Sequence, residues 1–487
     1  MTWNKILEKF LGVATFKPGQ KEALLALEKG EDTLALLPTG GGKSLIYQLF
    51  QYGRAGTTVI VSPLLALIED QLYQLQKLGL KRVLALTSQY RPAEREPFLE
   101  HLGQYQFILL SPEMLMQPEV LRALQKIPLR LFVVDEAHCI SQWGLNFRPE
   151  YLRLQEALAN LNWPLILAVS ATANERVMAD VNRHLFPPGR KRTVIQVPLD
   201  RPKLFYDRKI VPAAEKAAYL KAYLEHLPKP GIVYVHQKEE LAALVAWLKA
   251  ETSLRVTGYH GDLSSAERLA VQEQFQAGYL DVILATSAFG MGINQGNVRF
   301  VLHYHAPKTL AEYSQETGRA GRDGQFAYCL LLLDEDEEGR LSYFKHASLL
   351  TLAEFTSYLE TLVSYPLGKQ QLFLQDLPAD VNHTLSYYLK AYSTNTERQA
   401  AYQHFIAQEQ GAIGEMQAYL QDEKCLRKTL LAHFGQEPPE ERGLCCCYCS
   451  PDFSKSSTWQ SYLTQPSLKR SWQNSAIYRL QQLLGQK

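Results

Sequence analysis

The sequence predicts two consecutive α/β domains with parallel β-sheets, followed by a helical region that contains a cluster of cysteines. In both halves of the 487-residue chain, strand-like apolar runs alternate with helical patterns, which is typical of parallel sheets whose strands are joined by helices. Most of the seven cysteines lie in the last third of the chain. With 46% hydrophobic and 21% charged residues, the chain can bury two or three separate cores.

The expected strands are regularly spaced apolar runs. They are 33–37, 58–62, 83–87, 107–111, 131–135 and 165–170 in the first half, and 231–235, 255–259, 281–285, 299–304 and 327–333 in the second. Prolines at 198, 202 and 212 separate the halves, and an acidic run follows the last strand. We therefore expect a first α/β domain (1–198), a second (199–340), a helical segment without an assigned role (341–414), a cysteine-rich module (415–452) and a short tail (453–487).

A glycine-rich loop follows the first expected strand and precedes an amphipathic stretch, which is the context of a phosphate-binding loop. Small residues let backbone N–H groups surround phosphate oxygens at a helix N-terminus, where a lysine can reach the terminal phosphates and a serine can bind Mg²⁺. Leu37 stands where the strict pattern has glycine. The residues expected to bind a nucleoside triphosphate are Thr39, Gly40, Gly41, Gly42, Lys43 and Ser44.

An acidic pair follows the fifth expected strand. The apolar run 131–134 ends at Asp135 and Glu136, in the sequence Asp-Glu-Ala-His. An aspartate at a strand end can hold the water shell of Mg²⁺, and the next carboxylate can orient or deprotonate an attacking water. A glycine-rich turn or an acidic pair is common when it occurs alone. Together, each after its own strand, they predict a site that hydrolyses a nucleoside triphosphate.

Further motifs resemble a known family. They are Phe-Lys-Pro-Gly-Gln (16–20), Val-Ser-Pro-Leu (61–64), Asp-Glu-Ala-His-Cys-Ile-Ser-Gln-Trp (135–143), Ser-Ala-Thr-Ala (170–173), Phe-Gly-Met-Gly-Ile (289–293) and Gln-Glu-Thr-Gly-Arg-Ala-Gly-Arg-Asp-Gly (315–324). In this order they resemble the RecQ family of superfamily 2 DNA helicases. The resemblance implies two RecA-like domains and an ATP-dependent enzyme that moves 3′ to 5′ on single-stranded DNA in recombination and repair. Too few residues follow position 450 for a winged-helix domain, so the layout resembles the short RecS-type members.

The resemblance also implies roles around the nucleotide. Arg322 corresponds to the arginine finger, and Arg319 lies three positions before it, on the same face if the segment is helical. Gln20 corresponds to the residue that contacts the N6/N7 edge of adenine. Lys17 and Leu11 stand where the family usually has arginine and an aromatic residue, so contacts with the base are expected to be weaker.

The nucleic-acid contacts implied by the family fall on Ser62 and on an aromatic-rich loop. In that loop Trp143 and Phe147 offer ring faces for unpaired bases, and Arg148 adds positive charge. The loop departs from the family at positions 145 and 146, where Leu and Asn replace the usual His and Asp. Coupling between DNA binding and hydrolysis is therefore expected to be retained but tuned differently.

The late cysteines predict a metal site. Close-set thiols in a reducing compartment suggest zinc rather than disulfides, and the region resembles the family's zinc module. We assign Cys425, Cys446 and Cys449 as ligands. The fourth ligand is left open between Cys445 and Asp452, and a reactive cysteine cluster without metal is the alternative.

Charge gives only a local indication of nucleic acid. Lysine and arginine total 51 against 50 acidic residues, a net charge of +1, so there is no overall basic field. The densest basic stretch lies between the halves, and it is either a phosphate-binding track or a solvated linker. Its members are Arg190, Lys191, Arg192, Arg201, Lys203, Arg208 and Lys209.

No apolar stretch approaches the length of a membrane span, and the N-terminus lacks the layout of a signal peptide. We therefore expect a cytoplasmic protein without a membrane partner. The expected cofactors are ATP, Mg²⁺ and Zn²⁺, and the expected partners are single-stranded and tailed duplex DNA with single-strand-binding or recombination proteins. An RNA helicase, or a translocase with little unwinding, remains open because such motors grip mainly the backbone. A non-catalytic scaffold is disfavoured because the expected catalytic residues are all present.

Overall fold

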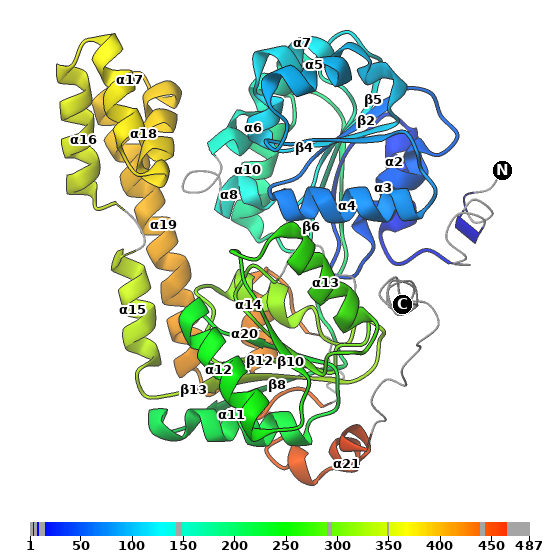
Figure 1. Ribbon diagram of the computed structural model, residues 1–487, viewed down its shortest axis with the longest axis vertical. Coiled ribbons are helices and arrows are strands. Elements are labelled where there is room, and N and C mark those ends of the chain that lie inside the picture. The colour runs from blue at the N-terminus through cyan, green and yellow to red at the C-terminus, as the bar shows by residue number, and fades with distance from the viewer. Residues whose placement is uncertain are drawn as a thin grey trace, which may run out of the picture. The chain divides into compact units, whose positions relative to one another are not determined.

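The computed structural model describes Trp3, Leu7, Glu8 and residues 15–142, 149–289, 295–347, 350–438 and 444–464. The chain divides into two compact units: unit 1 combines residues 1–199 with 346–409, and unit 2 combines 200–345 with 410–487. Each unit contains one parallel sheet (Figure 1), so the predicted pair of α/β domains is confirmed. Among the described residues, no helix is long and apolar enough to cross a membrane.

The sheet of unit 1 has seven strands in the order β3-β4-β2-β5-β6-β1-β7. The strands are β1 (Asp32–Leu36), β2 (Thr57–Val61), β3 (Val83–Leu86), β4 (Phe107–Leu110), β5 (Leu129–Val134), β6 (Ile166–Ser170) and β7 (Arg192–Gln196). The glycine-rich loop follows β1, and the acidic pair follows β5. Since β5, β6 and β1 are neighbours, their carboxyl ends bring these motifs to one edge of the sheet.

Helices cover both faces of this sheet. In β5, Leu131 and Val133 belong to one hydrophobic core, and Phe132 and Val134 to the other. This alternation explains why the strand reads as a continuous apolar run. The first core receives side chains from α2 (Gln20–Glu28), α3 (Lys43–Gln51) and α4 (Leu65–Lys77), and the second from α6 (Pro112–Leu115), α7 (Pro118–Leu124), α9 (Leu154–Asn160) and α10 (Glu175–Leu185). The remaining short elements are α5 (Pro92–Glu100), η1 (Leu102–Gln104), α8 (Cys139–Gln142) and η2 (Pro149–Arg153).

The sheet of unit 2 has six strands in the order β10-β11-β9-β12-β13-β8. They are β8 (Leu204–Ile210), β9 (Gly231–Tyr234), β10 (Val256–Tyr259), β11 (Val282–Ala285), β12 (Phe300–His303) and β13 (Ala327–Leu333). The described helices of this unit are η3 (Ala213–Glu215), α11 (Lys216–His226), α12 (Lys238–Glu251), α13 (Ser265–Gln276), α14 (Leu310–Thr317), α15 (Glu337–Ala347), the last part of α19 (Asn395–Gln421), α20 (Leu426–His433), η4 (Phe453–Lys455) and α21 (Ser457–Leu463).

Two strands, β7 and β8, are absent from the sequence-based prediction. Both lie at an edge of their sheet and fall in the basic stretch between the halves. The side chains of β7 alternate between exposed and half-buried, and those of β8 become exposed toward its end. The sequence therefore shows no continuous apolar run at either place.

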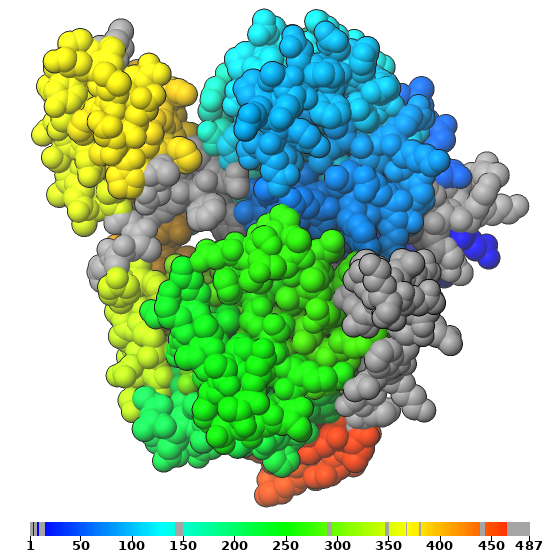
Figure 2. Space-filling view, in the orientation of Figure 1, coloured from blue at the N-terminus to red at the C-terminus, as the bar shows by residue number. Residues whose placement is uncertain are grey.

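The helical segment has its own small core. It consists of α16 (Leu352–Ser364), α17 (Leu367–Asp376), α18 (Ala379–Ala391) and the first part of α19 (Asn395–Gln421), and the outer surface of the segment is drawn mainly in yellow in Figure 2. Phe355, Tyr388 and Tyr402 are completely or almost completely buried in this core. Tyr388 therefore stabilises the segment, whereas Tyr343 of α15 is 68% exposed.

The chain after the cysteines contributes to unit 2. The ring of Phe453 stacks on Phe205 of β8 at 3.8 Å, and the hydroxyl of Tyr462 donates to the carbonyl of Arg299 at 2.9 Å. Both aromatic residues are buried in the core of unit 2. The described residues 453–464 are therefore an integral part of this unit rather than a loose tail.

A buried ion network joins the end of β13 to α15. Lys216 donates to Asp334 at 2.6 Å, and Arg340 donates to both Asp334 and Glu337. Burial raises the pKa of Asp334, but hydrogen bonds from Lys216 and Arg340 outweigh it and lower the pKa to about 2. His305, Asp334 and Glu337 are close enough to share a metal ion, yet the two basic side chains already balance the acidic charge.

Replacing Asp334 with asparagine should destabilise unit 2 by about 2 kcal/mol near neutral pH. A carboxylate whose folded pKa is lowered stabilises the fold above its unfolded pKa near 3.8 and loses this contribution as the pH falls toward 2. Thermal unfolding followed from pH 7 downward should show the variant and the wild type converging below about pH 4. Asp336→Asn, at an exposed position in the same turn, is the matched control. A difference that does not change with pH would contradict the role of the network.

Candidate nucleotide site and cysteine cluster

The glycine-rich loop connects β1 to α3, and two of its glycines are required by geometry. Gly42 caps α3 with a left-handed φ of 71°, and a Cβ there would lie 2.5 Å from Nε2 of Gln20. A Cβ on Gly41 would lie 2.8 Å from the carbonyl oxygen of Pro38. Glycine meets both constraints. The other predicted nucleotide-binding residues border these two: Thr39 and Gly40 precede them, and Lys43 and Ser44 begin α3.

Leu37 replaces the first glycine of the strict loop pattern without disturbing the loop. Its side chain is completely buried at the end of β1. Gly19 makes room for it, because a Cβ on Gly19 would lie 2.5 Å from a methyl carbon of Leu37. The Leu37 side chain, which departs from the strict pattern, therefore fills the core beneath the loop.

Gln20 binds the loop itself. Its Nε2 donates to the carbonyls of Gly41 at 2.9 Å and Gly42 at 3.0 Å, and its Oε1 accepts from the backbone N–H of Lys17 at 2.9 Å. With only 2% of its surface exposed, the carboxamide does not present the free edge that was predicted to read adenine. In this conformation Gln20 fixes the shape of the loop.

Lys43 and Glu136 form an ion pair at the sheet edge. The Lys43 ammonium lies 3.2 and 3.3 Å from the two carboxylate oxygens of Glu136. Glu136 has a left-handed φ of 46°, a conformation that is unfavourable for a residue with a side chain and persists only where the surroundings enforce it. The structure thus brings together two residues that are 93 positions apart and that the sequence assigns to one site.

Asp135 immediately follows β5 and precedes Glu136 in the chain. Its carboxylate accepts hydrogen bonds from the backbone N–H of Glu136 at 2.9 Å and from Nε2 of Gln71. Burial, followed by the neighbouring Glu136 carboxylate, raises the pKa of Asp135 to about 6. A cation would favour its charged form, as expected for a carboxylate that binds a metal. Gln71 was not predicted, because a single glutamine on an amphipathic helix carries no sequence signal.

The Asp-Glu-Ala-His motif contacts the Ser-Ala-Thr motif directly. Nδ1 of His138 lies 2.9 Å from the hydroxyl of Ser170, which donates to the carbonyl of Thr172 at 2.9 Å. His138 also lies 3.4 Å from Glu136. Burial lowers the pKa of His138, although Glu136 opposes this shift, so the imidazole is held neutral. The two motifs therefore form one hydrogen-bonded unit around Glu136.

The predicted nucleic-acid contacts are only partly described. Trp143, Phe147 and Arg148 lie outside the described residues. Ser62 follows β2 and is completely buried in this conformation, and its contact with DNA stays a prediction.

The two predicted arginines of unit 2 follow α14 rather than lying on one helical face. The helix ends at Thr317, and a turn with Gly321 at a left-handed φ of 57° follows. Arg319 is only 4% exposed. Nε of Arg322 donates to the carbonyl of Gly318 at 3.3 Å. The glycines explain the difference, because they end the helix that the spacing alone would continue.

Four cysteines of unit 2 form a compact cluster: Cys425, Cys445, Cys446 and Cys449 have their sulfur atoms within 4.8 Å of one another. The Sγ of Cys425 lies 3.4 Å from that of Cys445 and 4.0 Å from that of Cys446. Tetrahedral zinc with Zn–S bonds of 2.3 Å requires sulfur atoms about 3.8 Å apart, so this donor set fits zinc.

The cluster favours Cys445 over Asp452 as the fourth ligand, which the sequence left open. Cys445 belongs to it, whereas the side chain of Asp452 is 78% exposed and is paired with Lys455 at 2.7 Å. Cys447 lies outside the group of four. Since 445, 446 and 447 are consecutive cysteines, spacing alone could not show which of them turn toward Cys425.

The basic stretch between the halves is largely occupied by protein contacts. Arg190 pairs with Asp32 at 2.8 Å, and Arg201 and Arg208 donate to backbone carbonyls. The half-buried arginines of this stretch therefore stabilise the fold, and Lys191 is paired with Glu31 at 2.5 Å. The exposed Arg192, Lys203 and Lys209 are the members most accessible to phosphate.

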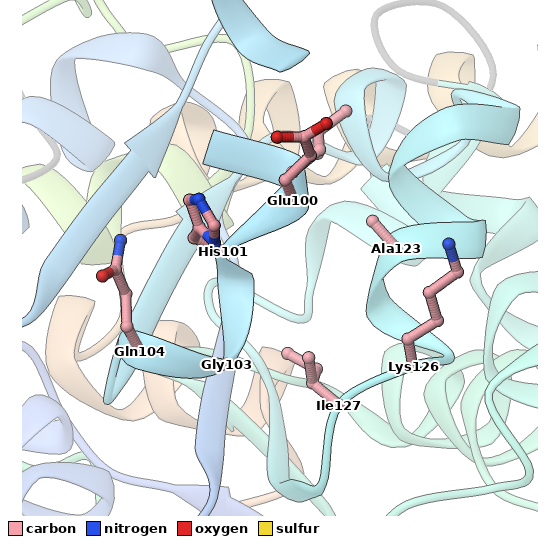
Figure 3. Close-up of a pocket in the computed structure, with 8 residues that line it drawn as sticks. Glu100, His101, Gly103, Gln104, Ala123, Lys126 and Ile127 are labelled. Carbon is pink, nitrogen blue, oxygen red and sulfur yellow. The ribbon is translucent and has the colours of Figure 1, made fainter. Parts of the chain in front are cut away.

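A hollow of about 370 Å³ lies elsewhere in unit 1, between η1 and α7 (Figure 3). Its lining includes both apolar and polar side chains, and none of the motif residues belongs to it. Its lining consists of Leu99, Glu100, His101, Gly103, Gln104, Ala123, Lys126 and Ile127. The chemistry predicted for unit 1 therefore lies at the sheet edge and not in this hollow.

Comparisons with known proteins agree with this geometry. Residues 17–181 match the family model of the DEAD/DEAH box helicases, and residues 215–324 match that of the helicase conserved C-terminal domain. A probable ATP-dependent DNA helicase RecS of Bacillus subtilis is 36% identical over 93% of this chain and 92% of its own length. The ATP-dependent DNA helicase RecQ of the same organism is 32% identical over 91% of this chain and 66% of that protein.

The chain belongs to the RecQ family of ATP-dependent DNA helicases. Its fold is similar to that of the Mycobacterium smegmatis helicase Lhr, solved with single-stranded DNA and AMP-PNP, with a TM-score of 0.55 and 21% identity over 68% of this chain and 47% of that one. This likeness supports the RecA-like fold of the two units. The RecQ-family relationship predicted from the motifs is confirmed, and it extends through the region of the cysteine cluster.

Proposed function

We propose that this RecQ-family chain hydrolyses ATP to move 3′ to 5′ along single-stranded DNA and to separate short duplexes in recombination and repair. It does so in the cytoplasm, where reduced thiols remain available to bind zinc. The observation that carries the proposal is the meeting of Lys43, Asp135 and Glu136 at one sheet edge. A phosphate-binding lysine, a metal-binding carboxylate and a second carboxylate for the attacking water are the parts that ATP hydrolysis requires.

In the proposed cycle, the Lys43 ammonium leaves the Glu136 carboxylate and binds the phosphates of the nucleotide. The ion pair at 3.2 Å occupies the ammonium until a triphosphate enters the loop and competes for it. Glu136 can then accept a proton from the attacking water, and its contact with His138 keeps it oriented. Ser44 and Asp135 would hold Mg²⁺, which when bound neutralises charge on the phosphates.

Arg322, assisted by Arg319, is proposed to stabilise the charge that develops on the transferred phosphoryl group. A guanidinium suits this role because its planar fork matches phosphate oxygens. Trp143 and Phe147 are proposed to stack on unpaired bases, with Arg148 on the backbone. These assignments rest on the family motifs at these positions.

Strand displacement tests the proposed substrate and direction. We expect ATP- and Mg²⁺-dependent opening of short DNA duplexes with a 3′ single-stranded tail, and little opening of 5′-tailed, blunt or RNA duplexes of the same sequence. Single-strand binding should weaken steeply with salt because the contacts are mainly to phosphates. Glu136→Gln, which keeps the side-chain volume but removes the base, is the control. Equal opening of the RNA duplexes would favour an RNA helicase, and efficient opening of long blunt DNA would contradict the proposed dependence on a tail.

We further propose that the four cysteines bind one zinc ion. Cys425→Ser should lower both the zinc content and the thermal stability, because metal-binding energy contributes to folding in such modules. Cys447→Ser is the matched control, since it removes a neighbouring thiol outside the cluster and should leave both quantities unchanged. Elemental analysis of freshly reduced protein measures the metal. Absence of zinc from the wild type would favour a reactive cysteine cluster.

A further inference from the structure

The Arg201 side chain forms hydrogen bonds with the backbone of the turn that carries Arg319 and Arg322. Its guanidinium donates to the carbonyls of Gly318 at 3.4 Å, Ala320 at 3.0 Å and Gly321 at 2.8 Å. These carbonyls follow the end of α14, where backbone acceptors have no partner within the helix and a positive charge is favourable. One side chain therefore holds three of the four residues 318–321 by their carbonyls.

Arg427 in turn holds Arg201 in place. Arg427 is 6% exposed, and its Nη1 donates to the carbonyl of Arg201 at 3.1 Å and to the carboxylate of Asp200 at 3.0 Å. Its Nη2 donates to the carbonyl of Leu204. Every donor in this set points to the short segment that enters β8. The segment that positions Arg201 is thus itself anchored by a buried guanidinium.

The cysteine cluster fixes the position of Arg427. Cys425 caps α20, and Arg427 lies in the first turn of that helix, which packs against both α14 and β8. On the other side of the cluster, Cys446 pairs with Tyr206 of β8, and the guanidinium of Arg427 lies 5.6 Å from the centre of the Tyr206 ring. The cluster therefore holds the start of α20 and the start of β8 in one arrangement.

We infer that Arg201 is a positioning residue for Arg319 and Arg322, and that Arg427 makes this positioning depend on the cysteine cluster. The inference rests on the proposed roles of the two arginines and of zinc. By this additional link, the metal site affects the rate of ATP hydrolysis through the guanidinium groups of Arg427 and Arg201. All residues of the link belong to unit 2.

The first experiment measures steady-state ATP hydrolysis by the full chain. Arg201→Ala and Arg201→Lys should lower kcat by about a hundredfold, the scale expected when a catalytic group is misplaced by about 1 Å. The KM for ATP and the zinc content should not change. Lysine fails because a single ammonium cannot satisfy three carbonyls as the planar fork does. Lys249→Ala, at an exposed basic position of α12 in the same unit, is the control and should keep the wild-type kcat.

A double-mutant cycle separates positioning from general stability. In an Arg322→Ala background, Arg201→Ala should cause little further loss of kcat, because both changes remove the same contribution. Full additivity of the two losses would overturn the inference. If Arg322→Ala alone left kcat unchanged, the proposed finger would be wrong, and this outcome is distinct from failure of the Arg201 link.

The link to the cysteines is tested by hydrogen exchange. The amides of Gly321 and Asp323 donate to the carbonyls of Val298 at 2.8 Å and Gly296 at 3.0 Å, so they report on the turn. Removal of zinc by a chelator should speed their exchange in the wild type. Arg427→Lys should do the same while zinc stays bound, with a fall in kcat similar to that of Arg201→Lys. Unchanged exchange in the turn, or an Arg427→Lys variant with wild-type kcat, would overturn the link.

Discussion

Arg322→Ala is expected to lower kcat for ATP hydrolysis by about three to five orders of magnitude, the effect typical of arginine fingers. The guanidinium stabilises charge that exists only in the transition state, so the loss should appear in kcat with little change in the KM for ATP. The side chain is only half-buried and bonds to the carbonyl of Gly318. Its removal should therefore leave the folding of unit 2 intact, and thermal unfolding checks this directly.

Two further variants make the Arg322 result specific. Arg322→Lys keeps the positive charge without the planar fork and should recover only a small part of the lost rate. Arg319→Ala should also lower kcat, but it removes a buried side chain, so its thermal stability must be compared with that of Arg322→Ala. A kcat for Arg322→Ala within about tenfold of the wild type would contradict the finger assignment.

Lys43→Ala is expected to reduce ATP hydrolysis at least a hundredfold, since removal of a single charge-stabilising donor commonly costs about two to three orders of magnitude. The variant also leaves Glu136, which is 11% exposed, without its main cationic partner. Single-stranded DNA binding, measured by fluorescence anisotropy, should be largely retained because Lys43 serves the phosphates of the nucleotide. Lys43→Arg is the charge-conserving control.

Hydrolysis by Lys43→Ala within about tenfold of the wild type would contradict the phosphate-loop assignment. Loss of DNA binding together with hydrolysis would show that the two functions share this residue. The thermal stability of Lys43→Ala separates both outcomes from simple unfolding, because a buried carboxylate that loses its partner is itself destabilising.

The sequence predicts the inner strands well because they are buried on both faces. The run 131–135, for example, becomes β5 over Leu129–Val134. The edge strands β7 and β8 were missed because they are not buried along their whole length, and an edge strand tolerates basic side chains such as Arg192 and Arg208. Their partners, β1 and β13, are distant in sequence, so no local sequence pattern indicates that β7 pairs with β1 or β8 with β13.

The contacts within the site are likewise only partly predictable from the sequence. The motifs predict that Lys43 and Glu136 meet, because each motif follows a strand of the same parallel sheet. They do not predict that the Gln20 carboxamide turns to the carbonyls of Gly41 and Gly42, since an amide can serve either the protein or a base. The contacts of Arg201 with residues 318–321 span more than a hundred positions. A basic stretch in a sequence does not show which of its charges are already used inside the fold.

The interleaved order of the chain has a consequence for biosynthesis. Unit 1 is completed only by residues 346–409, after most of unit 2 has been made, and unit 2 takes up residues 410–487 after that interruption. Phe453 and Tyr462, which fill the core of unit 2, are therefore added late. A ribosome releases residues in order at about 5–20 per second. For several seconds, therefore, the sheet of unit 2 lacks the side chains of Phe453 and Tyr462, and part of its core stays exposed to solvent. The nascent chain is then most exposed to aggregation, or to capture by chaperones, just before α21 emerges.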